Sequence, residues 1–318
     1  EPSDARDSRP APGTPRPFSA KTTMPEPRPH FVDSPYLVPF DGSFRIAEAP
    51  TCRGEDAPKK PEREARLAAD VAAIAAQQEA LYAEDKHAVL LVFQAMDAAG
   101  KDGTIRAVTA GLNPAGCMVQ SFKQPSQEAL DHDFLWRISL RLPERGRIGI
   151  FNRSHYEEVL VVRVHPGLLA NQRLPHGEPT PGLWERRYES IRDFEHHLAR
   201  NGTVILKFFL HVSKEEQRQR FLERIRDPEK NWKFSAHDVK QRAHWDDYMA
   251  AYQDALRATS RPWAPWYAIP ADSKSYMRMT VASIVRQTIE SLGLEFPRLS
   301  DAEQREMRSL REALEAEG

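Results

Sequence analysis

The feature that most constrains the fold is a short, continuous run of apolar residues that leads directly into a turn containing a Gly-Lys pair. Residues 88–93 read AVLLVF, and QAMDAAGKDGT follows at once. A run of this length, rich in β-branched residues, predicts a strand that is buried on both faces of a parallel sheet. The residues after the turn, Thr104–Leu112, have the pattern of a helix. The chain is therefore expected to fold around a strand–turn–helix unit.

The turn itself has the features of a phosphate-binding loop. Backbone N–H groups at a helix N-terminus and a mobile Lys charge together bind phosphate. Residues 95–104 read AMDAAGKDGT and depart twice from the common pattern GxxxxGK[ST]: Ala95 replaces the first Gly, and Asp102 replaces the Ser or Thr that holds Mg²⁺. Asp97 is therefore the predicted metal contact. For this segment alone, a charged surface turn remains the alternative.

Further apolar runs predict more strands of the same sheet. The runs are at 148–151, 204–210 and 266–269, and helical patterns lie at 61–85, 127–142, 183–200, 214–226, 236–258, 276–292 and 300–317. Buried strands that alternate with helices predict a three-layer α/β/α architecture with a parallel sheet.

Polar residues follow the strand predicted at 148–151. Asn152, Arg153 and Ser154 come at its carboxyl end, where ligands of open α/β sheets bind. P-loop enzymes usually place an acidic metal ligand here, whereas Asn152 is a neutral and weaker oxygen ligand. The alternative is a plain turn in which Ser154 caps the next helix.

Composition excludes several classes of protein. With a net charge of -1 over 318 residues, the chain is not a uniformly basic nucleic-acid binder. Two distant cysteines, Cys52 and Cys117, form neither a disulfide framework nor a Cys-based zinc site. The absence of an apolar stretch of about 18 residues and of an apolar N-terminal region predicts no membrane span and no signal peptide. We expect a cytoplasmic protein without nucleic-acid or membrane partners.

Basic residues are concentrated near the strand predicted at 148–151. Between residues 137 and 153 the only acid is Glu144, and the five basic residues are Arg137, Arg141, Arg145, Arg147 and Arg153. Such a cluster in a nearly neutral protein indicates a polyanionic ligand, because guanidinium groups fork onto phosphate oxygens. For Arg145 and Arg147 a solvated surface is the favoured interpretation.

Taken together, these segments resemble the polyphosphate kinase 2 family. The resemblance covers residues 60–293 and is carried by MDAAGKDGTIRAV, SFKQPS, DFLWR, FNRSHYEEVLVVRVH, LKFFLHVSKEEQRQRFLERIRDPEKNWKFS, WDDYMAAYQDALRATS and APWYAIPAD. It implies a P-loop kinase fold akin to thymidylate kinase, with a helical lid at about 170–200. The string NRSHYE is similar to the subgroup that phosphorylates both AMP and ADP.

The resemblance also implies an organisation of the chain and a set of site residues. Residues 1–30 are expected to form a disordered tail, 31–295 the kinase domain and 296–318 a C-terminal helix. The implied catalytic residues are Lys101, Asp97 and Arg153, and the implied ligands of Mg²⁺, or of Mn²⁺ in its place, are Asp97 and Asn152. The implied nucleotide- or polyphosphate-binding residues are Ala98, Gly100, Asp102, Gly103, Thr104, Arg106, Lys123, Arg137, Ser154, His155, Tyr156, Glu157, Arg187, Arg220, Lys230 and Lys233.

Three functional hypotheses follow. The first is a polyphosphate:nucleotide phosphotransferase that acts on AMP or ADP, or both, with inorganic polyphosphate, AMP, ADP and ATP as its ligands. The second is an ATP-dependent nucleoside monophosphate kinase, which the Asp102 substitution disfavours. The third is a catalytically silent P-loop protein that binds polyanions, which the intact Lys101, Asp97 and Arg153 disfavour. We also expect a homo-oligomer, either a dimer or a tetramer.

Overall fold

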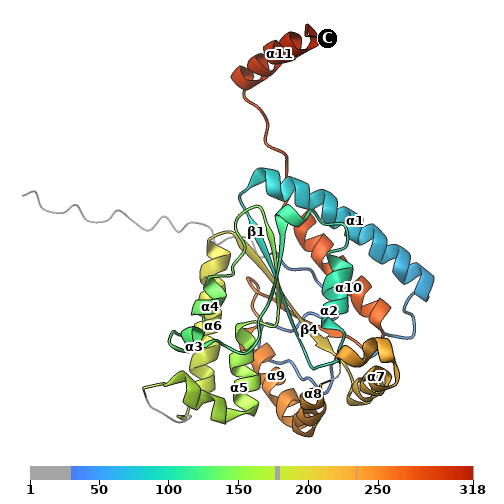
Figure 1. Cartoon of the computed structure of the whole chain (residues 1–318), viewed down its shortest axis with the longest axis vertical. Coiled ribbons are helices and arrows are strands. Elements are labelled where there is room, and N and C mark those ends of the chain that lie inside the picture. The colour runs from blue at the N-terminus through green and yellow to red at the C-terminus, as the bar shows by residue number, and fades with distance from the viewer. Residues whose placement is uncertain (1–29, 176–179, 234, 318) are drawn as a thin grey trace, which may run out of the picture.

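Strand β1 lies at the centre of a five-stranded parallel sheet (Figure 1), in the strand order β2-β3-β1-β4-β5. The computed structural model describes residues 30–175, 180–233 and 235–317, so the predicted tail falls almost entirely outside the described residues. Every residue of β1 except the last is buried, as the run AVLLVF predicts. The strands are β1 (Ala88–Ala95), β2 (Cys117–Ser121), β3 (Ile148–Asn152), β4 (Thr203–His211) and β5 (Trp266–Pro270).

Helices cover both faces of this sheet and make the predicted three layers. On one face α1 (Lys60–Glu84), α2 (Lys101–Val108) and α10 (Lys274–Glu290) pack together, and on the other α6 (Leu183–Arg200) packs on β4 beside α9 (Trp245–Thr259). No helix in the described part of the chain is long and apolar enough to cross a membrane. The remaining helices are α3 (Gln127–Leu130), α4 (Trp136–Ser139), α5 (Val161–Val164), α7 (Lys214–Arg226), α8 (Ala236–Gln241) and α11 (Asp301–Glu315); short 3-10 helices are η1 (Pro114–Gly116), η2 (His155–Val159), η3 (Pro166–Gln172), η4 (Pro228–Lys233) and η5 (Arg242–His244).

The four predicted strands are confirmed, but β2 was missed. It is an edge strand whose residues are half-buried or exposed, with Val119 53% exposed, and therefore it has no continuous apolar run. The helix predicted at 127–142 is wrong as one element, since the chain turns between α3 and α4. There the Asp133 carboxylate accepts from the backbone N–H of Leu135 at 2.8 Å and starts a new helical turn.

The helix at 183–200, within the range predicted as a lid, packs on the sheet. Its apolar residues Tyr188, Ile191 and Leu198 are buried against the sheet layer, so α6 is part of the core. Residues of η3, including Asn171 and Gln172 within the predicted lid range, line one side of the candidate site together with α8, and η4 lines the other side. The family resemblance implied a lid at about 170–200, and this lid stays a prediction; Arg187, one of its basic residues, is 4% exposed.

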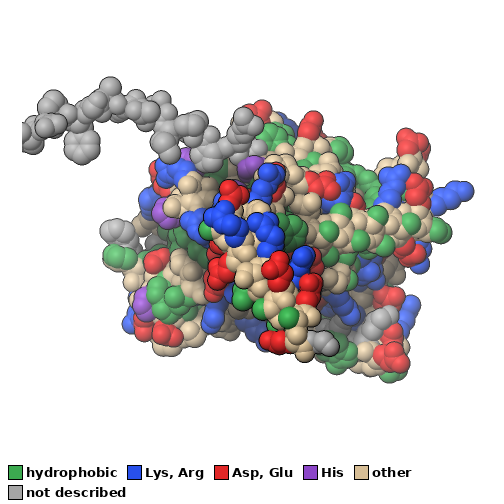
Figure 2. Space-filling view, turned by 90° about the horizontal axis from the view of Figure 1, so that it is seen from above, with side chains coloured by type: hydrophobic (Ala, Val, Ile, Leu, Met, Phe, Trp, Pro, Cys, Tyr) green, Lys and Arg blue, Asp and Glu red, His purple; other side chains and the backbone are tan. Residues whose placement is uncertain are grey.

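The C-terminal helix α11 stands apart from the rest of the molecule. It follows the irregular segment 293–300 and projects away from the sheet and its helices (Figure 1). Figure 2 shows the face of the molecule on this side, where basic and acidic side chains are interspersed.

A buried charged network ties α6 to the sheet beneath the loop that follows β3. Lys207 of β4 is fully buried, and its amino group donates to Glu195 at 2.5 Å, to the Tyr156 hydroxyl at 2.9 Å and to the carbonyl of Thr259 at 2.9 Å. Burial lowers the pKa of Lys207 to about 8, although Glu195 opposes the shift. The Tyr156 hydroxyl also donates to Glu195, at 2.8 Å. The network fixes the β3–α5 connection on which the site residues lie.

Substitution of Lys207 by Ala should lower the free energy of unfolding by about 3–5 kcal/mol, because the Glu195 carboxylate would stay buried without its cation. Urea unfolding followed by circular dichroism measures this. Replacement of both partners, Lys207→Met with Glu195→Gln, should cost less than the single change. Lys86→Ala, which removes an exposed pair with Glu84, should cost about 1 kcal/mol or less. Equal losses for Lys207→Ala and Lys86→Ala would contradict this account of the network.

Candidate active site

The loop between β1 and α2 is a strained turn, as a phosphate-binding loop requires. Ala98 and Gly100 both have left-handed backbone conformations, with φ of 62° and 102°. Gly adopts this conformation readily, whereas Ala98 costs about 1–2 kcal/mol. Strain of this kind persists where the surrounding structure holds it. The loop ends at the first turn of α2, where the Thr104 N–H donates to the Gly100 carbonyl at 3.0 Å.

Arg220 of α7 holds this loop in place. It is 4% exposed, and its guanidinium donates to the carbonyls of Ala98 at 3.1 Å and Ala99 at 2.6 Å. Its other nitrogens donate to the carbonyls of Ala271 and Asp272 and to Glu216. The guanidinium is thus committed to protein oxygens. We therefore assign Arg220 to positioning of the loop, and its direct contact with phosphate stays a prediction.

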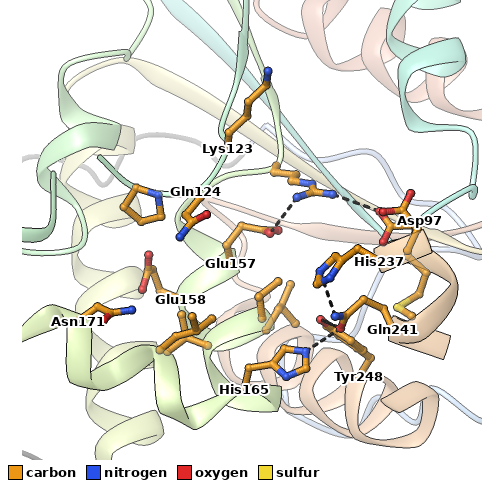
Figure 3. A pocket seen from close by; sticks show the side chains of 18 of the residues that line it. Asp97, Lys123, Gln124, Glu157, Glu158, His165, Asn171, His237, Gln241 and Tyr248 are labelled. Carbon is orange, nitrogen blue, oxygen red and sulfur yellow. Dashed lines mark hydrogen bonds and ion pairs between the residues drawn. The ribbon is translucent and has the colours of Figure 1, made fainter. Parts of the chain in front are cut away.

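Strand β3 brings Arg153 to the loop. Its N–H donates to the carbonyl of Phe93 in β1 at 3.1 Å, and its guanidinium lies between two carboxylates, 3.2 Å from Asp97 and 3.9 Å from Glu157 (Figure 3). Burial lowers the pKa of Arg153, but Glu157 and Asp97 outweigh it and leave that pKa raised. Burial and the charge of Arg153 lower the pKa of Lys101, against the attraction of the same carboxylates. Two cations and two carboxylates therefore share one charged centre.

Glu157 is held by a buried amide from β1. The Gln94 side-chain amide donates to Glu157 at 2.9 Å and accepts from the Ser154 hydroxyl at 3.0 Å. Burial raises the pKa of Glu157, and Arg153 and Lys101 offset only part of this shift. Gln94 is fully buried, so it fixes Glu157 at the edge of the charged centre. Gln94 was not predicted as a site residue, because a polar residue inside an apolar strand belongs to no local motif.

Two pockets meet at this charged centre. The larger, here the loop pocket, has a volume of about 1110 Å³ and lies over residues 96–103, with walls from α2, α7, η4 and α10. The smaller, here the aromatic pocket, has a volume of about 610 Å³ and is lined by Tyr248 and Tyr252 of α9, by α8 and by apolar residues of the segment 160–168 (Figure 3). The residues that line both pockets are Met96, Asp97, Lys123, Arg153 and Asp238.

Most of the predicted site residues line these pockets. Those of the loop pocket are Asp97, Ala98, Gly100, Lys101, Asp102, Gly103, Arg106, Lys123, Asn152, Arg153 and Arg220, and those of the aromatic pocket are Asp97, Lys123, Arg137, Arg153 and Glu157. The side chains of Lys230 and Lys233 lie outside the described part of the structure. The surface interpretation of Arg147 fits its ion pair with Glu144, at 3.0 Å.

Five predicted ligand residues line neither pocket. The Thr104 hydroxyl donates to the Gly100 carbonyl at 3.1 Å, and the Ser154 hydroxyl caps η2 by accepting from the Tyr156 N–H at 3.2 Å. His155 and Tyr156 are buried beside Glu195 in the charged network. Each of these four residues is at most 1% exposed and bonded within the protein, and ligand contact through them stays a prediction.

Arg187 is the fifth. Its guanidinium donates to the backbone carbonyl of Glu158 at 2.7 Å and lies over the Phe134 and Trp184 rings. Burial lowers its pKa, with Glu158 opposing the shift. Arg187 therefore supports the wall of the aromatic pocket from behind.

Arg278 of α10 is a loop-pocket cation that the sequence did not identify. A Cβ added at Gly103 would lie 2.8 Å from its guanidinium, so Gly103 is needed for the close approach of Arg278 to α2. Its Nε is buried without a hydrogen-bond partner within the described residues. Burial and the charges of Arg106 and Arg220 lower its pKa. The sequence feature that could have identified Arg278 is its position in the helix after APWYAIPAD, one turn beyond Lys274.

The protein itself offers few metal ligands here. The part of the chain that the structure describes holds no group of three or more His, Cys, Asp or Glu side chains suited to a metal ion. Asp97 presents one carboxylate to both pockets, and Asn152 lies beside Asp102, to which its amide donates at 2.8 Å. This donor set fits Mg²⁺, which takes one or two protein carboxylates and completes its coordination with phosphate oxygens and water.

A strained Gly-Lys loop after a central parallel strand, with cations converging on it, defines a P-loop kinase. The chain belongs to the polyphosphate kinase 2 family, whose model, Polyphosphate kinase 2, matches residues 57–296. The sequence-based resemblance is thereby confirmed, as is the α/β fold.

Known relatives support the same assignment. The chain is 57% identical over 238 residues to the ADP-polyphosphate phosphotransferase of Rhodopseudomonas palustris, covering 74% of this chain and 82% of that protein. It is 50% identical over 228 residues to the AMP/ADP-polyphosphate phosphotransferase of Meiothermus ruber, covering 72% and 81%. The crystal structure of polyphosphate kinase 2 from Arthrobacter aurescens matches with a TM-score of 0.79 at 37% identity, over 88% of this chain and 98% of that chain.

Replacement of Arg220 by Lys should weaken the binding of tripolyphosphate about tenfold, because several carbonyls of the loop would lose their donors and the loop would relax. Isothermal titration calorimetry measures this affinity. The matched control is Arg218→Lys on the same helix, where an exposed Arg pairs with Glu215 and substitution should change little. An unaltered affinity for Arg220→Lys would mean that the loop holds its shape without α7.

Proposed function

We propose that the protein transfers the terminal phosphoryl group of inorganic polyphosphate to AMP and ADP. The observation that carries the proposal is that the basic loop pocket and the aromatic pocket meet at Asp97 and Arg153. In-line phosphoryl transfer needs its two substrates on opposite sides of the transferring group. Two cavities that share one charged centre supply that arrangement.

The loop pocket is the proposed donor site. Among the described residues that line it, eight are Lys or Arg and four are Asp or Glu. A linear polyanion binds such a surface and releases its counterions, much as a nucleic acid does in a basic groove. Arg106 and Arg278 extend the basic lining beyond the loop, which suits a chain of phosphates longer than the tail of a nucleotide.

The aromatic pocket is the proposed acceptor site. Its volume of about 610 Å³ falls in the usual range for small-molecule sites. Apolar residues such as Leu160 and Val161, together with the rings of Tyr248 and Tyr252, suit a purine base. The acceptor phosphate would then lie near Arg153 and Lys123, where the two pockets join. The relatives support this choice of acceptors, since two of them are named for ADP and for AMP and ADP.

The residues of the charged centre supply the chemistry. The acceptor is a phosphate oxygen that is already ionised at neutral pH, so no general base is required. Lys101 and Arg153 neutralise charge that develops on the transferring group, and their fixed positions make that stabilisation effective. Asp97 would hold Mg²⁺, with Asn152 as a neutral neighbour, and the bound ion would neutralise further phosphate charge. Mn²⁺ is a chemically similar substitute.

A donor comparison tests the proposal. The protein is mixed with Mg²⁺ and with AMP or ADP, and the donor is either long-chain polyphosphate or ATP. We expect product from polyphosphate and not from ATP. Lys101→Ala should lower kcat roughly 10²–10³-fold because it removes a preorganised charge from the transition state. Lys86→Ala, before the opposite end of β1, should retain activity.

Each other outcome of this assay selects another hypothesis. Product from ATP alone would indicate an ATP-dependent nucleoside monophosphate kinase. No turnover with either donor would indicate a protein that binds polyanions without catalysis. Full activity of Lys101→Ala would remove the loop from the reaction.

Glu157 is the residue we expect to set the balance between the two acceptors. Its carboxylate lies in the aromatic pocket beside Arg153 and opposes the approach of a more negative acceptor. Glu157→Asn should therefore raise the ratio of kcat/KM for ADP to kcat/KM for AMP by about tenfold. This is the effect expected when one negative charge near the acceptor is removed and its repulsion is partly screened by solvent. Glu144→Gln, on the exposed loop before β3, is the control. An equal loss on both acceptors would mean that Glu157 maintains structure only.

A further inference from the structure

We propose that α11 pairs in parallel with the α11 of a second copy of this chain. The first turn of this helix is stabilised by its own side chains. Ser300 and Glu303 form a capping box, in which the Ser300 hydroxyl accepts from the Glu303 N–H and the Glu303 carboxylate accepts from the Ser300 N–H. A capping box satisfies two N–H groups that a helix start otherwise leaves unpaired.

The helix lacks the packing that would keep it folded. None of the residues of α11 is buried, and the structure gives it no substantial contact with any other described element. A 15-residue helix is marginal in water on its own. Helices of this length normally gain their stability by burying an apolar face. A partner for that face is therefore needed.

The apolar face of α11 has the spacing of a coiled-coil seam. Met307, Leu310 and Leu314 are separated by three and then four residues, and they are 54%, 58% and 67% exposed. Alternating spacings of three and four place residues on one stripe of a helix, at the a and d positions of a heptad. The stripe lies in the last two turns, beyond the capping box.

Charges beside the stripe select the second copy of the chain as the partner, and they select its direction. With Met307 at position a, Glu306 occupies position g and Arg311 position e. In a parallel pair the g residue of one helix faces the e residue five positions later on the other, so Glu306 meets Arg311 on both sides of the seam. An antiparallel pair would instead place Arg311 near Gln304 and Glu306 near Ala313, without opposite charges.

The competing contact of Arg311 is weak. Its guanidinium lies 3.5 Å from Glu315 on the same helix, and both side chains are about two-thirds exposed, at 68% and 67%. Exposed pairs of this kind contribute little, so Arg311 can exchange Glu315 for the partner's Glu306.

The connection to the rest of the chain permits the pairing. Segment 293–300 has no regular structure and can span roughly 26–29 Å when extended. A parallel pair places both kinase domains at the same end of the two helices. Two connections of this reach leave room for the domains to lie side by side.

Disulfide trapping tests the pairing in the full chain. In a Cys52→Ser background, which removes the exposed native thiol, Leu314→Cys should form a chain-to-chain disulfide at low micromolar concentration. Residue 314 meets its own copy only when the helices run parallel. Glu306→Arg or Arg311→Glu alone should slow the cross-link about fivefold through like charges, and the double swap should restore the rate.

Two further results complete the test. Leu310→Glu, which places a charge in the seam, should abolish the cross-link while leaving kinase turnover unchanged. If Leu314→Cys gives no cross-link under oxidising conditions, or if the double swap is no better than the single changes, the parallel pair is wrong. A cross-link that is equally fast in every variant would indicate random collision and would likewise overturn the proposal.

Discussion

In the register between β1 and β3, Phe93 lies opposite Asn152, and the next residue, Arg153, donates its N–H to the Phe93 carbonyl. One strand carries Asp97 just beyond its end and the other carries Arg153. The shared register therefore places the Asp97 carboxylate and the Arg153 guanidinium 3.2 Å apart. A shift of either strand by one residue would turn its side chains to the opposite face of the sheet. The loop, the charged centre and the junction of the two pockets all depend on this pairing.

The arginines of the site have two different roles: some line the loop pocket, and others hold neighbouring segments in place. Arg153, Arg106 and Arg278 line the loop pocket. Arg187 donates to Glu158 and Gln172, and Arg220, although it also lines that pocket, donates to loop carbonyls. Guanidinium suits both tasks because its planar fork satisfies several oxygens at once. Charge that is buried in this way helps to hold the loop and the wall of the aromatic pocket in place. The free energy of substrate binding is then not spent on ordering them.

Much of the fold followed from the sequence because its signals are local. The run AVLLVF identifies β1, and the Gly-Lys turn identifies the loop, since both depend on neighbouring residues alone. Strand β2 lacked such a signal because an edge strand is only partly covered. The site was harder to predict, because His155 and Tyr156 belong to a conspicuous motif and yet face the interior. Their direction is set by Lys207 and Glu195, which are distant in sequence. Arg278 was missed for the same reason: only the folding of α10 against α2 brings it to Gly103.

The central claim is that donor and acceptor occupy separate pockets and react directly across the centre formed by Asp97 and Arg153. Initial velocities measured over a matrix of polyphosphate and AMP concentrations test it most directly. If both pockets must be filled before transfer, double-reciprocal plots should give lines that intersect. Parallel lines would mean that the enzyme accepts the phosphoryl group covalently before AMP binds. That result would contradict direct transfer between the two pockets.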